Sequence, residues 1–524
     1  MKTSDPQFSG TKSYACCPAH DHKDAPGNSI SRRKFIKVAG GTTLSVAALS
    51  GLSWSVLANK GMKEQYGLVR QALVVKPILV YSTPEYKPQT SWRSWGGIQT
   101  DEDAREEISR IKGELGKLRS AADFPVDFLP AAAIKGPKDV DGIPDLDSAD
   151  TFLVYAAGGW MDTFDALHKR KKDMIFFCRH KSGPVYLWYE IISPRFLRQH
   201  TDQLAVSGVD EEDVVIDNQD EILWRLRALC GLKNTRNASI IAIGGAGGWA
   251  QAKGVVPKLV ENTFKFGIKS LPYSELGKII VDAKKDASAV SRARQRAAEY
   301  LDDSSLSLET NRTYLDNCFL LEEVFQKIMD QENCRAITIN GCMGTIMPLA
   351  ETSACMTLSL LNDAGYLAFC ESDFVVIPAG ILLSNISGKP VFLNDPTYPH
   401  DGIITLAHCT APRRMDGKKY EPARILTHFE SDYGAAPKVE MKKGQVVTNI
   451  IPDFQFNRYV ALKGTIIDNP FMDICRSQID ISYDVDSHLL ARRMPGFHWM
   501  TGYGDYMRET GYALKRLGIE WEQM

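Results

Sequence analysis

The sequence has almost no excess charge of either sign, and it lacks the short motifs that identify several classes of enzyme. The formal net charge of the 524 residues is -2, which argues against a nucleic-acid-binding protein because such proteins present a basic face to the phosphates. No GxxxxGK[ST] or GxSxG motif occurs, and the glycine cluster at Gly244-Gly-Ala-Gly-Gly248 lacks GxGxxG spacing. A Walker nucleotide site, a nucleophile-elbow hydrolase and a dinucleotide fingerprint therefore have no support, and the glycine cluster is interpreted as a strand-to-helix turn.

The cysteines also lack a pattern. None of the eleven is part of a CxxC motif, so neither a zinc ribbon nor a dithiol redox centre is indicated. Nine follow residue 58 and mostly stand in apolar runs, as Cys178 does after Met174-Ile-Phe-Phe. We expect these nine to behave as small buried hydrophobic residues rather than as disulfides or ligands.

The first 58 residues resemble an export signal. Ser31-Arg-Arg-Lys-Phe-Ile-Lys37 precedes a mildly apolar stretch that runs from Val38 to Ala58, which is typical of a twin-arginine signal. We expect export by the twin-arginine machinery to the periplasm or the cell exterior, with cleavage after Ala58. An uncleaved membrane anchor is the alternative. Substrates of this machinery cross the membrane already folded, which suits an enzyme loaded with a metal in the cytoplasm.

The remaining chain alternates strand and helix signals and predicts an α/β protein. At about 100 to 200 residues per domain it should form about three domains: an N-terminal α/β domain (59–233), a central α/β domain (234–386) and a mainly β domain (387–524). Apolar runs predict strands, and charged periodic segments predict helices. The strands are expected at 76–81, 151–156, 173–178, 239–243 and 336–340, and the helical segments at 101–119, 282–331 and 503–517.

Four possible metal ligands stand in the last third of the chain: Glu371, Asp395, His408 and His498. The first three follow short apolar runs at 367–370, 391–394 and 403–407, so each is expected at the end of a buried strand. Parallel strands deliver their ends to one crevice, where the three side chains would converge on a hard divalent cation. Glycoside hydrolysis by Glu371 and Asp395 alone would leave the histidines unexplained. Helix caps or surface turns for the carboxylates, and a hydrogen-bonded core position for His498, are the structural alternatives.

Six short segments resemble the L-fucose/L-arabinose isomerase superfamily, and this resemblance extends from about Asn237 to the end of the chain. They are Ala336-Ile-Thr-Ile-Asn340, Leu361-Asn-Asp-Ala-Gly-Tyr366, Cys370-Glu-Ser-Asp373, Leu393-Asn-Asp395, Ala407-His-Cys-Thr-Ala-Pro412 and Gly496-Phe-His498. The resemblance implies two doubly wound α/β domains followed by a mainly β domain, with a Mn²⁺ site between the last two. It also implies a homo-oligomer, a trimer or hexamer, in which the first domain of a neighbouring subunit closes the site.

Carried over residue by residue, the resemblance makes Glu371, Asp395, His408 and His498 the metal ligands. Asp395 is similar to the second carboxylate of the fucose branch, and His408 resembles the metal histidine of the arabinose branch. The activity implied is the interconversion of an aldose and a ketose through an enediol, in which Mn²⁺ or Mg²⁺ polarises two sugar oxygens while a base moves a proton between adjacent carbons. We expect Glu371 to be the principal base, with Asp395 as acid or base on the other side of the enediol.

Four further residues are candidates for binding the sugar. Arg413 follows the metal histidine closely and would bind a carboxylate, sulfate or hydroxyl group, although a solvated basic turn is the alternative. Trp499, Arg93 and Trp95 would stack on the sugar or bind to it, the last two from a loop after the first strand and across a subunit interface. Two other functions stay open: an exported sugar-binding or structural protein without turnover, and an epimerase or lyase acting on an unusual sugar.

Overall fold

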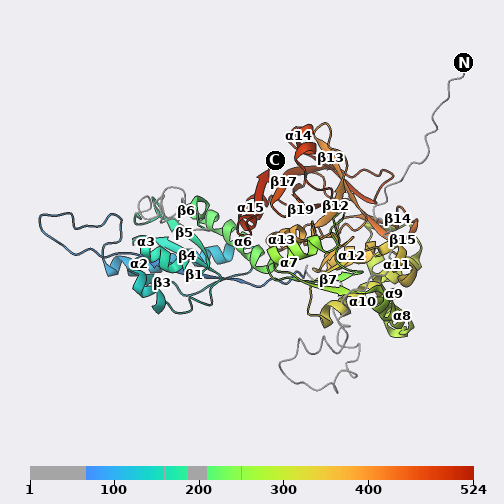
Figure 1. The fold of residues 1–524 in the computed structure, drawn as a ribbon, viewed down its shortest axis with the longest axis horizontal. Coiled ribbons are helices and arrows are strands. Elements are labelled where there is room, and N and C mark those ends of the chain that lie inside the picture. The colour runs from blue at the N-terminus through green and yellow to red at the C-terminus, as the bar shows by residue number, and fades with distance from the viewer. Residues whose placement is uncertain (1–66, 159–160, 187–208, 250) are drawn as a thin grey trace, which may run out of the picture.

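The chain forms two parallel-sheet α/β units followed by an antiparallel barrel (Figure 1). The computed structural model describes residues 67–158, 161–186, 209–249 and 251–524. The predicted export signal at 1–58 lies outside these residues. In the described part of the chain, none of the helices combines the length and the apolarity that a membrane crossing requires.

The first sheet has the order β2-β1-β4-β5-β6, with β3 also paired to β1, and all of its pairs are parallel. Its central strands are apolar throughout because helices cover both faces. Helix α2 begins at a capping box in which Thr100 and Asp103 each bind the other's backbone N–H. The strands are β1 (Leu73–Val80), β2 (Val126–Phe128), β3 (Ala132–Ile134), β4 (Thr151–Ala156), β5 (Asp173–Cys178) and β6 (Val214–Ile216). The helices are α2 (Asp101–Ala121), η3 (Pro137–Gly142), α3 (Met161–His168), η4 (Glu211–Asp213) and α6 (Gln219–Thr235).

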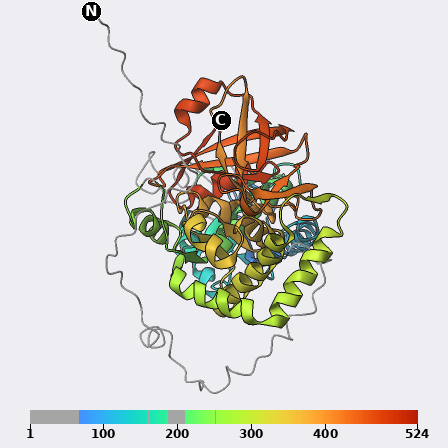
Figure 2. The ribbon, with the colours of Figure 1, turned by 90° about the vertical axis from the view of Figure 1, so that its right-hand side faces the viewer.

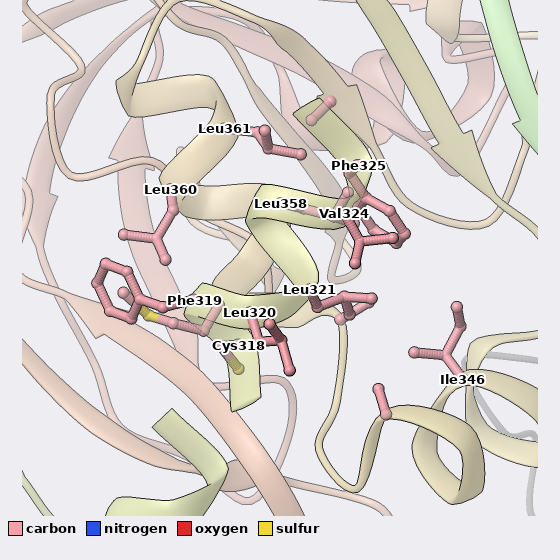
Figure 3. Packing of buried hydrophobic residues seen from close by; sticks show 14 of the residues in the cluster. Cys318, Phe319, Leu320, Leu321, Val324, Phe325, Ile346, Leu358, Leu360 and Leu361 are labelled. Atoms are coloured by element: carbon pink, nitrogen blue, oxygen red, sulfur yellow. The ribbon is translucent and has the colours of Figure 1, made fainter. Parts of the chain in front are cut away.

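The second sheet is also parallel and has the order β11-β10-β7-β8. Its strands are β7 (Ser239–Ile243), β8 (Gly267–Leu271), β10 (Ala336–Ile339) and β11 (Leu367–Phe369). Its helices are α7 (Val255–Thr263), α8 (Tyr273–Lys285), α9 (Ala287–Leu301), α10 (Arg312–Gln331), α11 (Cys342–Ala350), α12 (Cys355–Asp363) and α13 (Ile377–Ser387). Phe319, Leu321 and Phe325 of α10 belong to one core cluster with Leu358 and Leu361 of α12 (Figure 3).

The third unit is an antiparallel barrel. Its strands follow the order β16-β19-β12-β13-β18-β17, and β16 also pairs with β17, which closes the circle; β20 adds to β17 in parallel. Figure 2 places this barrel above the helices α8 to α10. The barrel elements are β12 (Phe392–Pro396), β13 (Ile403–His408), β16 (Val446–Pro452), β17 (Arg458–Asp468), β18 (Ser477–Ser482), α14 (Ser487–Arg493), β19 (Trp499–Tyr503), α15 (Met507–Lys515) and β20 (Glu520–Gln523). A separate sheet joins β9 (Leu306–Leu308), β14 (Ala423–His428) and β15 (Tyr433–Val439).

Helix α6 connects the first sheet to the rest of the molecule. It packs on α13 and α15, and the contact with α13 is so close that a Cβ at Gly231 would lie 2.3 Å from a side-chain carbon of Ile386. A glycine is required at that point for steric reasons, because any side chain would force the two helices apart.

The α/β class with a mainly β C-terminal region is confirmed, and the strands at 151–156, 173–178 and 239–243 have the bounds that the sequence predicts. Two local predictions are wrong. The helical region 282–331 is interrupted by β9, whose short segment pairs with β14 of another part of the chain. Helix α14 interrupts the strands of the last unit, where no helix is expected before residue 503. Asp486 caps it by accepting a hydrogen bond from the Leu489 N–H.

Candidate metal centre

Glu371 lies at the end of a parallel strand in a backbone conformation that is rare for its residue type. It follows β11 after one residue, and Glu371 and Ser372 both have positive φ, 66° and 48°. The Ser372 N–H donates to Thr338 Oγ1 over 3.1 Å, and Gly247 bridges to Asp373. Strained residues of this kind persist where the surrounding structure fixes them, and they concentrate at functional sites.

The Glu371 carboxylate lies between two imidazoles. Oε1 is 3.6 Å from His408 Nε2, and Oε2 is 3.2 Å from His498 Nε2. The His498 Nε2 is also 3.0 Å from Asp395 Oδ1. The buried atoms His498 Nε2 and Asp395 Oδ2 have no hydrogen-bond partner among the described residues. Four residues that the sequence singles out as ligands are therefore brought together.

Both histidines are oriented by the ring nitrogen that faces away from Glu371. His498 Nδ1 donates to Asp373 Oδ2 over 2.7 Å, and His408 Nδ1 is 3.0 Å from Thr410 Oγ1. Metal-binding histidines have this arrangement, in which an outer carboxylate or other polar group binds one nitrogen and leaves the other to the ion. The two Nε2 atoms are accordingly positioned as ligands.

The strands that carry these residues differ from the prediction. Glu371 does follow a parallel strand, but Asp395 and His408 lie within the antiparallel strands β12 and β13, where Asp395 is opposite Ala407. The predicted positions near strand ends are confirmed, since His408 is the last residue of β13 and Asp395 the last but one of β12, but the prediction that these strands are parallel is wrong. Short apolar runs have the same appearance in a closed barrel and in a parallel sheet, because both bury the strand. The centre joins the end of β11 to one part of the barrel.

Three carboxylates and two imidazoles share this centre, and the pKa values of Glu371, His408 and His498 are shifted by their neighbours. Burial acts to raise the pKa of Glu371, but contacts with His408 and His498 lower it to about 2. Burial acts to lower the pKa of His408, yet Glu371 and Asp395 raise it to about 8. Burial also acts to lower the pKa of His498. Asp395, Asp373 and Glu371 outweigh this effect and raise that pKa well above 6.5. The carboxylates therefore favour positive charge in this centre, and either protons or a bound cation would supply it.

Cation binding should therefore depend on pH. In the cation-free protein, the raised pKa of His498 favours the protonated ring near pH 6.5, whereas a cation needs the neutral ring. We expect Mn²⁺ affinity to rise as the pH increases above 6.5 towards the raised pKa of His498, by about tenfold per pH unit for the one proton that His498 releases. Calorimetric titrations in buffers of different ionisation enthalpy measure the released protons. An affinity that does not change over this interval would contradict the assignment.

Asp373→Asn should weaken cation binding without removing a ligand. An asparagine at this position can still accept from His498 Nδ1 through its amide oxygen but lacks the negative charge, so it holds the imidazole less firmly and makes Nε2 a weaker ligand. Loss of such a partner costs about 10- to 100-fold in metal affinity. Titration with Mn²⁺ in competition with a chelator measures the change. Asp432→Asn, in an exposed turn between β14 and β15, is the control and should leave the affinity as it is.

Arg413 and Trp499 are engaged by the protein core rather than exposed to a ligand. The Arg413 guanidinium pairs with Asp303 over 2.8 Å, donates to the Glu421 carbonyl and lies over the rings of Tyr300 and Tyr420. Trp499 is fully buried in the barrel core. Neither side chain has a recorded contact with Glu371, so the structure provides no contact that supports their predicted roles in sugar binding.

Arg93 and Trp95 lie in the segment 81–100 between β1 and α2. In Figure 1 this segment projects from the first unit, at the opposite end of the molecule from β12 and β13. Arg93 lies over the Trp92 ring at 5.1 Å, and the Trp95 side chain is 57% exposed. Within one chain, these residues do not reach the centre.

Two features of the centre were not predicted. Asp373 is the partner of His498, although its only sequence signal is its place two residues after Glu371. Trp249 follows the glycine cluster and packs on Phe497, with ring centroids 4.0 Å apart. The Phe497 ring in turn packs on His498, also with centroids 4.0 Å apart. The glycine cluster is thus part of the wall of the centre. It is not a tight turn, because β7 ends at Ile243 and α7 begins only at Val255.

No model of a known protein family matches the chain, and no curated protein matches it. The function must therefore be inferred from the centre itself. Its donors are carboxylate oxygens and imidazole nitrogens, which suit Mn²⁺ and comparable divalent ions.

Proposed function

We propose that the protein is a metal-dependent aldose–ketose isomerase with a fold like that of the L-fucose/L-arabinose isomerases. The observation that carries the proposal is the position of His498, which is oriented by Asp373 and stands between the carboxylates of Glu371 and Asp395. The order of the units, two parallel α/β sheets followed by a barrel, also supports it. Fold alone does not imply function, so the argument depends on the donors.

The proposed cation site consists of Glu371, Asp395 and His498, and its two carboxylates would have to move closer together on binding, because the ligand atoms of these three residues do not all lie within 4.8 Å of one another. In octahedral coordination at about 2.1 Å, neighbouring ligand atoms lie about 3.0 Å apart. The contacts of His498 Nε2 with the two carboxylates, 3.2 and 3.0 Å, have the length of such edges. When bound, Mn²⁺ or Mg²⁺ would supply a Lewis acid that polarises the sugar carbonyl and the neighbouring hydroxyl.

The two carboxylates have different tasks in this proposal. The Glu371 side chain is a buried carboxylate that is ionised. In this form it accepts a proton from the carbon next to the carbonyl and returns it to the adjacent carbon. Asp395 is more accessible, with a side chain 24% exposed, and moves the proton between the two sugar oxygens. The Trp249 and Phe497 rings provide an apolar wall for the C–H face of the sugar.

Hydrogen exchange at carbon tests the proposal. An isomerase that works through an enediol incorporates deuterium from D₂O at the carbon next to the carbonyl, which NMR detects for each member of a panel of aldoses and ketoses. We expect exchange and interconversion with the Mn²⁺-loaded protein and none with Glu371→Gln. Sugar binding without exchange would favour the binding-protein alternative, and exchange with inversion at one carbon would favour an epimerase.

We also propose that the protein is exported and forms a homo-oligomer in which segment 81–100 of one subunit covers the centre of a neighbour. The exposed aromatic side chains of this segment, Tyr86 at 71% and Trp95 at 57%, support this proposal, since exposed aromatic clusters are typical of contact sites. Light scattering of the purified protein gives the number of subunits. A monomer that still catalyses exchange would rule out the trans-acting segment.

A further inference from the structure

A small cavity next to Glu371 is lined mainly by sulfur. Five of the nine described cysteines surround it, although they are widely separated in the sequence. They are Cys342, Cys355, Cys370, Cys409 and Cys475, all buried. The cavity volume is about 20 Å³, which is enough for one ion or one water molecule and far too small for a sugar.

Three side chains of this cavity have the geometry of a cation site of their own. The ligand atoms of Cys370, Glu371 and His408 all lie within 4.8 Å of one another, and this is the one such group of three in the described parts of the chain. The His408 Nε2 atom approaches Glu371 Oε1, whereas His498 and the hard-cation site are on the side of Oε2. Glu371 therefore presents a different oxygen to each imidazole.

We propose that the cavity is a second cation site, specific for a thiophilic ion of the Zn²⁺ type, held by Cys370 Sγ, Glu371 Oε1 and His408 Nε2. Cysteine, histidine and glutamate are the ligands of Zn²⁺. In tetrahedral coordination at about 2.1 Å, oxygen and nitrogen ligands lie about 3.4 Å apart, which is close to the 3.6 Å between Glu371 Oε1 and His408 Nε2. On binding, the Cys370 thiol and the protonated His408 ring each give a proton to solvent as the zinc–sulfur and zinc–nitrogen bonds form.

The arrangement assigns His408 to the thiophilic ion and makes Glu371 a bridge between two unlike cations. Cys342, on the same cavity wall, can supply a fourth ligand, and the remaining thiols provide a soft, buried surrounding. The bridge would also explain why Glu371 is held in a strained conformation. This inference shares Glu371 with the proposed function but does not require isomerase activity: with an ion on each carboxylate oxygen Glu371 would have no free oxygen to act as the base, so the thiophilic ion would inhibit turnover.

Cobalt is the probe, because a Co²⁺–thiolate bond gives a near-ultraviolet charge-transfer band that oxygen and nitrogen ligands do not give. The full-length protein, reduced and freed of metal, is titrated with Co²⁺ alone and then with Zn²⁺ as competitor. We expect the band to appear at one Co²⁺ per chain, to disappear with Zn²⁺, and to be lost in Cys370→Ser. Cys475→Ser, which removes another thiol of the same cavity, is the matched control and should keep the band.

The variants separate this site from the hard-cation site. Asp395→Asn should keep the cobalt–thiolate band but lose Mn²⁺, whereas Cys370→Ser should lose the band but keep Mn²⁺. Circular dichroism checks that each variant is folded, and His408→Gln, which should weaken the band, replaces Cys370→Ser if that variant does not fold. The inference is overturned if the wild type gives no band, or if the band survives Cys370→Ser and depends on Cys475 instead.

Discussion

Glu371→Gln is expected to abolish turnover while the fold remains intact. The substitution keeps the size of the side chain and removes its charge, so the site loses both an oxygen ligand of the cation and the group that accepts the proton. Loss of general base catalysis alone costs about 10²- to 10⁴-fold in rate, and loss of the cation adds to it. The rate of deuterium incorporation and the thermal unfolding midpoint are the two measurements.

A matched control distinguishes the effect of removing the Glu371 charge from the effect of replacing any glutamate by glutamine. Glu309→Gln removes a half-exposed carboxylate that pairs with Arg424 at 2.7 Å, and exposed pairs of this kind contribute only about 0 to 1 kcal/mol. Turnover of that variant should equal the wild type. A Glu371→Gln protein that retains most of the wild-type rate would refute the role of Glu371 as base.

His498→Ala should remove the hard cation altogether. Loss of an outer partner of a metal histidine costs about 10- to 100-fold in affinity, so removal of the histidine itself should cost more than about 100-fold. The variant also leaves Glu371, Asp373 and Asp395 near one another without the imidazole. Breaking a buried pair of charges costs about 3 to 5 kcal/mol, so we expect the cation-free variant to unfold at a lower temperature than the cation-free wild type.

His488→Ala is the control for this variant, because His488 is exposed on α14 outside the centre. Its Mn²⁺ affinity and its unfolding midpoint should match the wild type. Chelator competition measures the affinity of both variants. An unchanged affinity in His498→Ala would exclude His498 as a ligand.

Much of the fold follows from local patterns. Thr151–Ala156 and Asp173–Cys178 are apolar runs bounded by polar turns, and they form buried parallel strands of the predicted length. The same pattern does not specify the partner of a strand. The runs before Asp395 and His408 are therefore equally compatible with a parallel sheet and with the antiparallel barrel that they form.

The candidate ligands were recognised by residue type, but their surroundings were not. The sequence gives no measure of burial for Arg413 or Trp499, whose types suit sugar binding and whose side chains are instead enclosed by the core. The cysteines are scattered in the chain, and only the packing of α11, α12, the turn after β11, the residue after β13 and the segment before β18 gathers five of them around one cavity. Contacts between residues more than 100 positions apart, such as His498 with Asp373, have no local signal.

The most direct test of the central claim is the manganese content of the purified protein after reconstitution with Mn²⁺ and removal of excess metal. The arrangement of Glu371, Asp395 and His498 predicts one tightly bound manganese per chain at pH 8, and less at pH 6.5, where a proton competes for His498. A wild-type protein that stays free of manganese under both conditions would contradict the metal centre and, with it, the proposed isomerase.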